Sequence, residues 1–290
     1  MDAINPSPKS KNLIPTAAQL FERLPRTLRR HRLMKAWMTL TREDPRQLVR
    51  IRDQSFGYAD MSDGFLRLIV IEGDFEREFF AIADECLGNG GVFLDVGANF
   101  GLLSCGLAGR QGSKVQFHLF EPNRTLVEWI KRSMARYPAV DFKINCTAVS
   151  DRLGVISFMI NKDQTGASHI TPEGGEQIRS VTIDEYLDRE NIATVNLMKL
   201  DIEGAELLAL RGAQELLLGP SAPVIVLEVN PRTLALSGTS ADEVLGLLSD
   251  CGYSCRPIAT YGSHTPDPWT NMLAAKPGHR ERFPTLNEPQ

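Results

Sequence analysis

Strand-like and helix-like segments alternate along most of the chain after residue 90. Short apolar runs are followed by stretches in which apolar residues recur every three or four positions. The first pattern predicts strands buried on both faces, and the second predicts helices that pack against them. Their alternation is typical of an α/β protein with a doubly wound, mostly parallel sheet. The expected strands are residues 92–96, 115–120, 142–149, 195–200, 224–229, 253–258 and 271–275.

Polar capping residues mark the starts of three expected helices. Asn123 precedes a segment with apolar residues at helical spacing. Thr182 and Ser240 are each followed three residues later by a glutamate, which is the capping-box pattern. Gly252 suits the end of the helix that Ser240 would open. We therefore expect helices to begin directly after each of these three polar residues.

The first 90 residues follow a different pattern. Between Arg26 and Leu40, apolar residues are spaced among basic ones, which predicts one or two surface helices. Residues 56–71 contain two strand-forming segments separated by Ser62-Asp63-Gly64, which is typical of a β-hairpin. The expected divisions of the chain are a basic, partly helical extension (1–50), a hairpin with a lead-in helix (51–90), the main α/β domain (91–277) and a C-terminal tail (278–290).

The composition is that of an ordinary globular protein. The chain has 290 residues, of which 42% are hydrophobic and 23% charged, and its mean hydropathy is -0.17. These values argue against global disorder and against a coiled coil. No apolar stretch reaches the roughly 18–20 residues of a bilayer span, and Met1–Ser10 lacks the apolar segment of a secretory signal. We expect a cytoplasmic location.

Charge is distributed unevenly along the chain. Residues 23–50 contain nine Arg or Lys and two acids, a formal charge of +7. Because the whole chain is at -4 and residues 1–22 are neutral, residues 51–290 carry -11. The basic segment, which includes Arg29, Arg30, Arg32 and Lys35, could contact an anionic acceptor, a carrier protein or a membrane surface, or could be a solvated helix face. The acidic remainder argues against nucleic acid.

A glycine-containing loop follows the first strand of the main domain. Gly97 and Gly101 would let the backbone turn sharply at the start of a helix, where N–H groups favour phosphate or carboxylate. The loop is not a complete GxGxxG motif, because Asn99 stands at the second glycine position. Glu121 follows the second strand, 26 residues after Asp95, where an acid suits the hydroxyls of an adenosine ribose. Together they suggest an adenosine-containing cofactor, although each alone could be an ordinary turn or a surface acid.

Six motifs in order resemble those of the FkbM family of S-adenosylmethionine-dependent methyltransferases. They are VFLDVGANFG, HLFEPN, AVSD, VTIDEYL, NLMKLDIEGAELLALRGA and VIVLEVN. The resemblance runs from about Gly91 to about Ile258 and includes the segment 56–71. It implies a class I methyltransferase fold, a Rossmann-like seven-stranded sheet whose last strand is antiparallel. It also implies O-methylation of a hydroxyl on a sugar, glycolipid or secondary metabolite.

The resemblance assigns cofactor-binding residues by position. The methionine end of S-adenosylmethionine would lie against the glycine loop, the ribose against Glu121 and the adenine against the AVSD segment. A methionine carboxylate benefits from helix N–H groups, whereas its ammonium and the sulfonium need acids nearby. The residues implied are Asp95, Gly97, Asn99, Gly101, Glu121, Ala148, Val149, Asp151 and Asp201.

The chemical site is expected at the fourth and fifth strands. In an extended chain Lys199, Asp201 and Glu203 face one side, and the expected strand order brings Asp201 close to Asp95 and Glu228. Such acids need a compensating cation, which could be the cofactor, Lys199 or a divalent metal. Asp201 or Glu203 is the expected general base. Either residue, or Glu228, could instead orient the acceptor.

Simpler roles remain open for these residues. Glu203 could be an acid at a helix start, and Lys199 could be a structural ion-pair partner. Asp201, Glu228 and Asn230 carry oxygen ligands suited to a metal, although a metal is not expected. The five cysteines lack zinc-type spacing and are expected to be reduced.

A polar loop at residues 163–176 could cover the cofactor and read the acceptor. Its His169 is a candidate proton acceptor, ranked below Asp201, and could equally be solvated.

Three functions are therefore compared. The leading one is an S-adenosylmethionine-dependent methyltransferase with a small-molecule or glycan acceptor. A protein that binds the same cofactor but has lost catalysis, and that holds a partner through the basic segment, is the first alternative. An NAD-dependent oxidoreductase on a similar sheet is the second, and it would lack the acids around Asp201.

Overall fold

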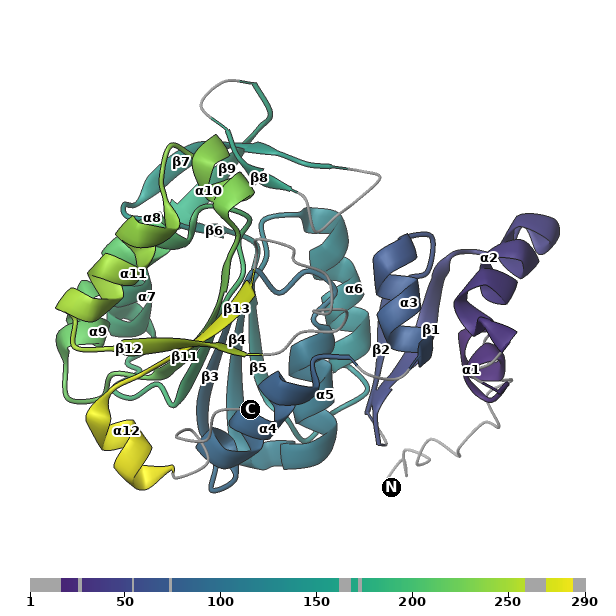
Figure 1. Cartoon of the computed structure of the whole chain (residues 1–290), viewed down its shortest axis with the longest axis horizontal. Helices are drawn as coiled ribbons and strands as arrows, with labels where there is room; N and C mark the ends of the chain where they lie inside the picture. Colours follow the sequence, from purple (N-terminus) through teal and green to yellow (C-terminus); the bar gives the residue numbers. More distant parts are fainter. Residues whose placement is uncertain are drawn as a thin grey trace, which may run out of the picture.

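A seven-stranded sheet with helices on both faces forms the body of the protein (Figure 1). The computed structural model describes residues 17–25, 28–53, 55–72, 75–161, 168–171, 174–258 and 270–283. The strand order in the sheet is β12-β13-β11-β10-β3-β4-β5. The strands are β3 (Gly91–Val96), β4 (Val115–Phe120), β5 (Asp141–Asn145), β10 (Leu197–Leu200), β11 (Val224–Val229), β12 (Ser254–Ile258) and β13 (Thr270–Ala275).

Five neighbouring strands of this sheet run parallel, and β13 runs antiparallel to both β11 and β12. This arrangement confirms the predicted class I methyltransferase fold. The chain reverses its direction of travel across the sheet between β3 and β10, which pair directly. Ligands of doubly wound sheets bind at such a reversal, beyond the carboxyl ends of the strands.

Strand residues alternate between two hydrophobic clusters, one on each face. Phe93 and Leu197 belong to the cluster under the first helical layer, whereas their neighbours Leu94 and Met198 belong to the other. Both faces are therefore buried, as the apolar strand pattern predicts. One layer contains α4 (Arg77–Leu87), α5 (Leu102–Gln111) and α6 (Arg124–Met134). The other contains α7 (Ile183–Glu190), α8 (Glu206–Arg211), α9 (Gln214–Leu218) and α11 (Ala241–Asp250).

The predicted helix starts are confirmed by their caps. The Asn123 side chain accepts from Thr125 N at 2.9 Å and opens α6. Thr182 Oγ1 accepts from Glu185 N at 3.2 Å and opens α7, and Ser240 caps α11 in the same way. Two short helices complete the main domain, α10 (Pro231–Leu236) after β11 and α12 (Pro277–Arg282) after β13.

The N-terminal hairpin lies earlier in the chain than predicted. Its strands are β1 (Arg46–Arg52) and β2 (Ser55–Asp60), and residues after them form the helix α3 (Gly64–Glu72). The prediction of a second strand after Gly64, in residues 65–71, is therefore wrong. The apolar residues in this segment have no clear period, so the pattern does not separate a helix from a strand. In the structure, Asp63 Oδ1 accepts from Leu66 N at 3.0 Å, which stabilises the start of the helix. The helix predicted between Arg26 and Leu40 is present as α2 (Arg30–Thr41), and a short helix that was not predicted, α1 (Ala17–Glu22), precedes it.

A second, four-stranded sheet with the order β6-β9-β7-β8 lies beside the main one. Its strands are β6 (Ala148–Val149), β7 (Gly154–Met159), β8 (His169–Ile170) and β9 (Glu176–Val181). The single strand predicted over 142–149 is therefore divided between two sheets. Residues 163–167 and 172–173 of the predicted cofactor-covering loop lie outside the described residues. No helix in the described ranges has both the length and the apolar content needed to cross a bilayer.

The hairpin is attached to the main domain through the free edge of β2. Tyr137 Oη accepts from Phe56 N at 2.7 Å and donates to Phe56 O at 2.6 Å. Ser133 Oγ accepts from Tyr58 N at 2.9 Å. On the facing helix α5, Ser55 Oγ donates to the Gly106 carbonyl at 3.0 Å. Side chains at the end of α6 thus take the place of a neighbouring strand.

We predict that Tyr137→Phe lowers the free energy of unfolding by about 1–3 kcal/mol, because it leaves both backbone groups of Phe56 without this partner. Tyr253→Phe is the matched comparison, since it removes one buried hydrogen bond, to the Pro223 carbonyl. Urea denaturation of both variants measures the effect. A loss for Tyr137→Phe no larger than that for Tyr253→Phe would contradict the bridging role.

Candidate active site

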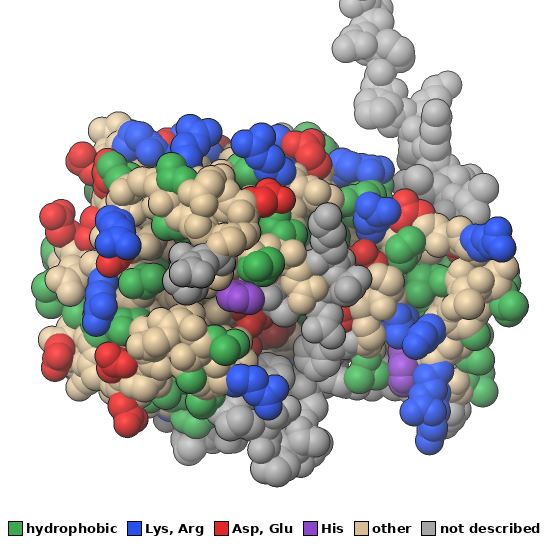
Figure 2. All heavy atoms as spheres, turned by 90° about the horizontal axis from the view of Figure 1, so that it is seen from above, with side chains coloured by type: hydrophobic (Ala, Val, Ile, Leu, Met, Phe, Trp, Pro, Cys, Tyr) green, Lys and Arg blue, Asp and Glu red, His purple; other side chains and the backbone are tan. Residues whose placement is uncertain are grey.

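A cavity of about 680 Å³ lies at the carboxyl ends of β3, β4, β10 and β11. Its wall also includes residues from the turn before α3, the residues before α4, and β8. Figure 2 shows acidic side chains at the bottom of a hollow on this face. The cavity is large enough for a nucleoside-containing ligand.

The loop after β3 is shaped by a close approach to the loop after β10. A Cβ atom on Gly97, whose φ is 84°, would lie 1.8 Å from the Asp201 carbonyl oxygen. This position therefore requires glycine. Gly101, with φ at 69°, begins α5. The N–H groups of Gly97 and Ala98 donate to the Phe120 carbonyl, so these two groups are already used inside the protein.

Glu121 lies beneath this loop and holds it. Its Oε2 accepts from Asn99 N at 2.9 Å and its Oε1 accepts from Asn123 N at 2.8 Å. The side chain is 6% exposed and lines the cavity, so it is not a surface acid. Burial raises the pKa of Glu121 to about 7, although the two backbone hydrogen bonds oppose the shift. Asn99 adopts a φ of 51°, which is unusual outside glycine.

Lys199 is the buried cation of the site. Its Nζ lies 2.5 Å from Asp201 Oδ2, and its side chain is almost inaccessible. Burial works against its charge, but Asp201 and Asp95 outweigh this and raise the pKa of Lys199. Asp95 is also buried and accepts from Ser104 Oγ at 2.6 Å. Lys199 is thus an ion-pair partner of Asp201.

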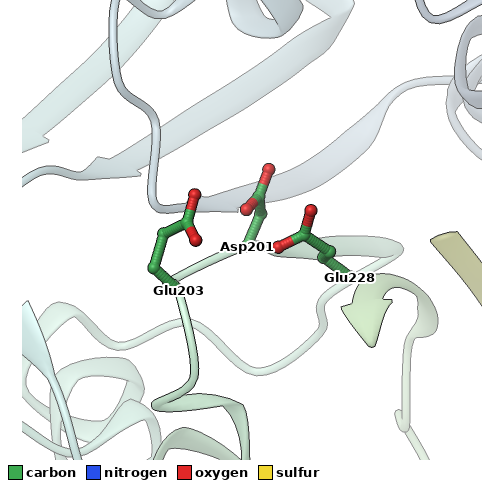
Figure 3. A group of neighbouring side chains, drawn as sticks. All are labelled: Asp201, Glu203 and Glu228. Carbon is green, nitrogen blue, oxygen red and sulfur yellow. The ribbon is translucent and has the colours of Figure 1, made fainter. Parts of the chain in front are cut away.

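Two further carboxylates, those of Glu203 and Glu228, meet Asp201 beside this ion pair. Side-chain oxygens of Asp201, Glu203 and Glu228 all lie within 4.8 Å of one another (Figure 3). Burial, followed by the charge of Asp201, raises the pKa of Glu203 to about 8 and that of Glu228 to about 9. Glu228 Oε2 is buried and has no hydrogen-bond partner among the described residues. The site therefore contains more acid than Lys199 neutralises.

Glu203 is not the helix-start acid. Its φ of 53° lies in the left-handed region, and α8 begins three residues later. Glu206 fills that role, because its Oε1 accepts from Ile202 N at 3.0 Å and Gly204 N at 3.2 Å. Burial raises the pKa of Glu206 to about 7. Its position at the start of the α8 segment was the only sequence signal for this residue.

Two polar cavity residues, Glu76 and Asn271, were not among the predicted site residues. Glu76 precedes α4, and burial raises its pKa while Lys199 opposes the shift. Asn271 of β13 is in register with Glu228 of β11. Its Nδ2 lies 3.5 Å from Glu76 Oε2, a long hydrogen bond. The pairing of Asn271 follows from the antiparallel last strand, whereas no local pattern identifies Glu76.

The structure does not bring every predicted residue to the cavity. Ala148 and Val149 line it, but Asp151 and Gly101 are not among the described lining residues. His169 is also absent from that set, although its neighbours Ser168 and Ile170 belong to it. The role of His169 on β8 (His169–Ile170) as a proton acceptor therefore stays a prediction.

Asn230 lines the cavity, but its Oδ1 accepts from Arg232 N at 3.1 Å and caps α10. Among the acidic side chains of the site, Asp201, Glu203 and Glu228 have oxygens within 4.8 Å of one another. Among the cysteines, Cys86, Cys105 and Cys251 are buried, and none of the five forms a disulfide.

The family of this protein is shown by a sequence match to a segment that contains most of the residues lining the cavity. The model of the methyltransferase FkbM domain matches residues 95–255, more than half of the chain. The chain belongs to the FkbM methyltransferase family. A relative is the hexuronic acid methyltransferase AglP of Haloferax volcanii, which is 26% identical over 164 residues, or 56% of this chain and 63% of that protein.

Solved structures of other methyltransferases are more distant. FkbM methyltransferase from Methylobacillus flagellatus aligns with a TM-score of 0.46 and 19% identity over 84% of this chain and 58% of its own. Fibrillarin from Aeropyrum pernix, in complex with natively bound S-adenosyl-L-methionine, aligns with a TM-score of 0.40 and 11% identity over 64% and 66%. The chain thus spans less than two thirds of the Haloferax and Methylobacillus proteins.

We predict that the ligand-free protein loses stability as pH rises from about 5 to 9. A raised carboxyl pKa means that the folded state holds protons that the unfolded state has released, so the contribution of Glu203 and Glu228 is present below their unfolded pKa values and disappears as pH rises through about 8 and 9.

Thermal unfolding across this pH range measures the effect. Glu203→Gln and Glu228→Gln should each flatten the decline, and Glu215→Gln, at an exposed position on α9, should not. A decline of equal steepness in all four proteins would exclude the acid cluster as its cause.

Proposed function

We propose that this FkbM-family protein transfers a methyl group from S-adenosylmethionine to a hydroxyl group of a sugar-containing acceptor. The observation that carries the proposal is the meeting of Asp201, Glu203 and Glu228 in the cavity that Glu121 also lines. The hexuronic acid named for the Haloferax relative supports a sugar acceptor. Proton-accepting groups beside the acceptor support a hydroxyl as the methylated group.

The cavity suits a cationic cofactor. The buried, unpartnered Glu228 Oε2 and the raised pKa of Glu203 both point to a missing positive charge. Asp95 and Asn99 would face the methionine portion, Glu121 the ribose, and the β6 strand the adenine. When bound, the sulfonium of S-adenosylmethionine supplies an electrophilic methyl group.

Within this proposal, the surroundings of each acid determine its role. The ion pair with Lys199 holds Asp201 in place and keeps its charge compensated, so Asp201 orients ligands at the centre of the site. Glu203 has no such partner, and its raised pKa makes it the better proton acceptor. We therefore propose Glu203 as the general base and Asp201 as the orienting residue, with Glu228 positioning the acceptor.

A pyrophosphate dinucleotide fits the site less well. The N–H groups of Gly97 and Ala98 are used by the Phe120 carbonyl, and that of Asn99 by Glu121. These are the groups that would cradle a phosphate in a complete glycine motif. The surrounding carboxylates would also repel it. The remaining alternative, binding of S-adenosylmethionine without catalysis, is separated from the proposal only by turnover.

We predict that the protein binds S-adenosylmethionine and S-adenosylhomocysteine but not NAD in isothermal titration calorimetry. Glu121→Ala should weaken S-adenosylmethionine binding at least tenfold, because it removes the ribose acceptor and releases Asn99 N. Glu128→Ala, at an exposed ion pair with Lys131 on α6, is the control with unchanged affinity. Selective binding of NAD would reject the proposed cofactor.

We predict that Glu203→Gln retains S-adenosylmethionine affinity within a few fold but slows methyl transfer by about 10²–10⁴-fold, as expected for loss of a general base. The assay follows labelled methyl transfer to a panel of hexuronic acid and hexose glycosides. The wild-type rate should rise with pH as Glu203 ionises, at or below about pH 8, because the bound sulfonium favours its charged form. Wild-type turnover in Glu203→Gln would exclude Glu203 as the base, and absence of transfer by any protein would favour binding without catalysis.

A further inference from the structure

Large hydrophobic side chains are exposed mainly at one end of the molecule. Eleven such residues are exposed in the described parts of the chain, and six of them lie between residues 20 and 40. Leu40 is 83% exposed and Trp37 is 46% exposed. The six residues, which we call the N-terminal apolar face, are Leu20, Leu24, Leu28, Leu33, Trp37 and Leu40.

Helix α2 has two apolar stripes, and only one of them is buried. Met34 is completely buried and belongs to the main hydrophobic cluster, against which Met38 also packs. Leu33, Trp37 and Leu40 are spaced at i, i+4 and i+7 and form a second stripe on the exposed side. Folding of the chain therefore explains the first stripe and leaves the second in contact with water.

Basic residues surround this exposed stripe. Arg32 and Lys35 are exposed on the same helix, and between residues 17 and 43 the sequence has seven Arg or Lys and two glutamates. Of these glutamates, Glu22 is paired with Arg50, and Glu43 accepts from Trp37 Nε1 at 2.9 Å. Figure 2 shows Lys and Arg side chains beside hydrophobic ones at the end of the molecule that carries α1 and α2.

We propose that the N-terminal apolar face binds the surface of an anionic lipid bilayer. Exposed leucines and a tryptophan would enter the interfacial region, and the basic residues beside them would meet lipid headgroups. Apolar and electrostatic attraction together provide the two contributions that stable peripheral binding requires. A second copy of the chain is disfavoured because two such basic faces repel, and nucleic acid does not account for the leucines.

The face is fixed relative to the cavity. Helix α3 packs against both α1 and α2, and the turn that precedes it, Ser62-Asp63-Gly64, lines the cavity. Arg67 of α3 joins these parts, because its Nε donates to the His31 carbonyl at 3.1 Å and its Nη1 donates to the Met61 carbonyl. Since residues 51–290 carry -11, an anionic surface would attract the basic end and repel the body. Binding would therefore orient the molecule as well as hold it.

Flotation of the full chain with lipid vesicles tests this proposal. Vesicles of phosphatidylcholine alone are compared with vesicles of phosphatidylcholine and phosphatidylglycerol in equal amounts. We expect binding at least tenfold tighter to the anionic vesicles, weakened by added salt. The double variants Leu33→Gln/Leu40→Gln and Arg32→Glu/Lys35→Glu should each weaken this binding tenfold or more.

The matched control is Leu218→Gln/Leu236→Gln, which replaces two exposed leucines on α9 and α10, away from α1 and α2 (Figure 1), and should leave vesicle binding unchanged. Circular dichroism and S-adenosylmethionine binding verify that the variants fold. Equal binding to neutral vesicles, no binding to either kind, or unchanged binding by both double variants would overturn the proposal. So would a dimer, or a complex with an acidic protein, that forms through this face while vesicles are ignored. None of these outcomes depends on methyl transfer.

Discussion

The surplus of carboxylates around one buried lysine is the constraint on which the site depends. Lys199 lies on β10 between β3 and β11, so its ammonium is close to acids from both neighbouring strand ends. One cation compensates Asp201 and part of the charge of Asp95, but Glu203 and Glu228 remain without a positive partner. A buried carboxyl group without a positive partner keeps its proton unless a bound ligand supplies a positive charge. The raised pKa values of these two residues and the unpartnered Glu228 Oε2 are two consequences of the same imbalance.

Much of this arrangement followed from sequence because parallel strands end at one edge of the sheet. Once the strand order was expected, Asp95, Asp201 and Glu228 had to be neighbours. The direction of side chains in the second sheet could not be predicted from the strand order in this way. Whether Asp151 or His169 faces the cavity depends on how β6 to β9 pair, and a shift of one residue reverses the face. Because residues 142–149 were predicted to form one strand, the second sheet was not predicted.

The N-terminal extension explains the remaining differences between prediction and structure. The apolar run at 64–72 has no period that separates a helix from a strand, so the hairpin was placed too late in the chain. Glu76 enters the site only because the extension packs on the main domain, a long-range contact with no local signal. The two parts share one hydrophobic cluster, in which Met34 and Val49 of the extension join Phe93 of β3. The proposed boundaries at residues 50 and 90 therefore mark changes of pattern within a continuous core.

Two buried glutamates stabilise unusual backbone in two loops that line the cavity. Asn99 and Glu203 both have positive φ, a conformation that costs of order 1–3 kcal/mol and persists only when neighbouring groups enforce it. Glu121 enforces the first turn by accepting from Asn99 N, and Glu206 enforces the second by accepting from the N–H groups on either side of Glu203. Both supporting acids have pKa values raised to about 7 by burial. The shape of the loops that would hold the cofactor and the acceptor is therefore coupled to the charge of the acids beneath them, and a cation bound in the cavity would stabilise both.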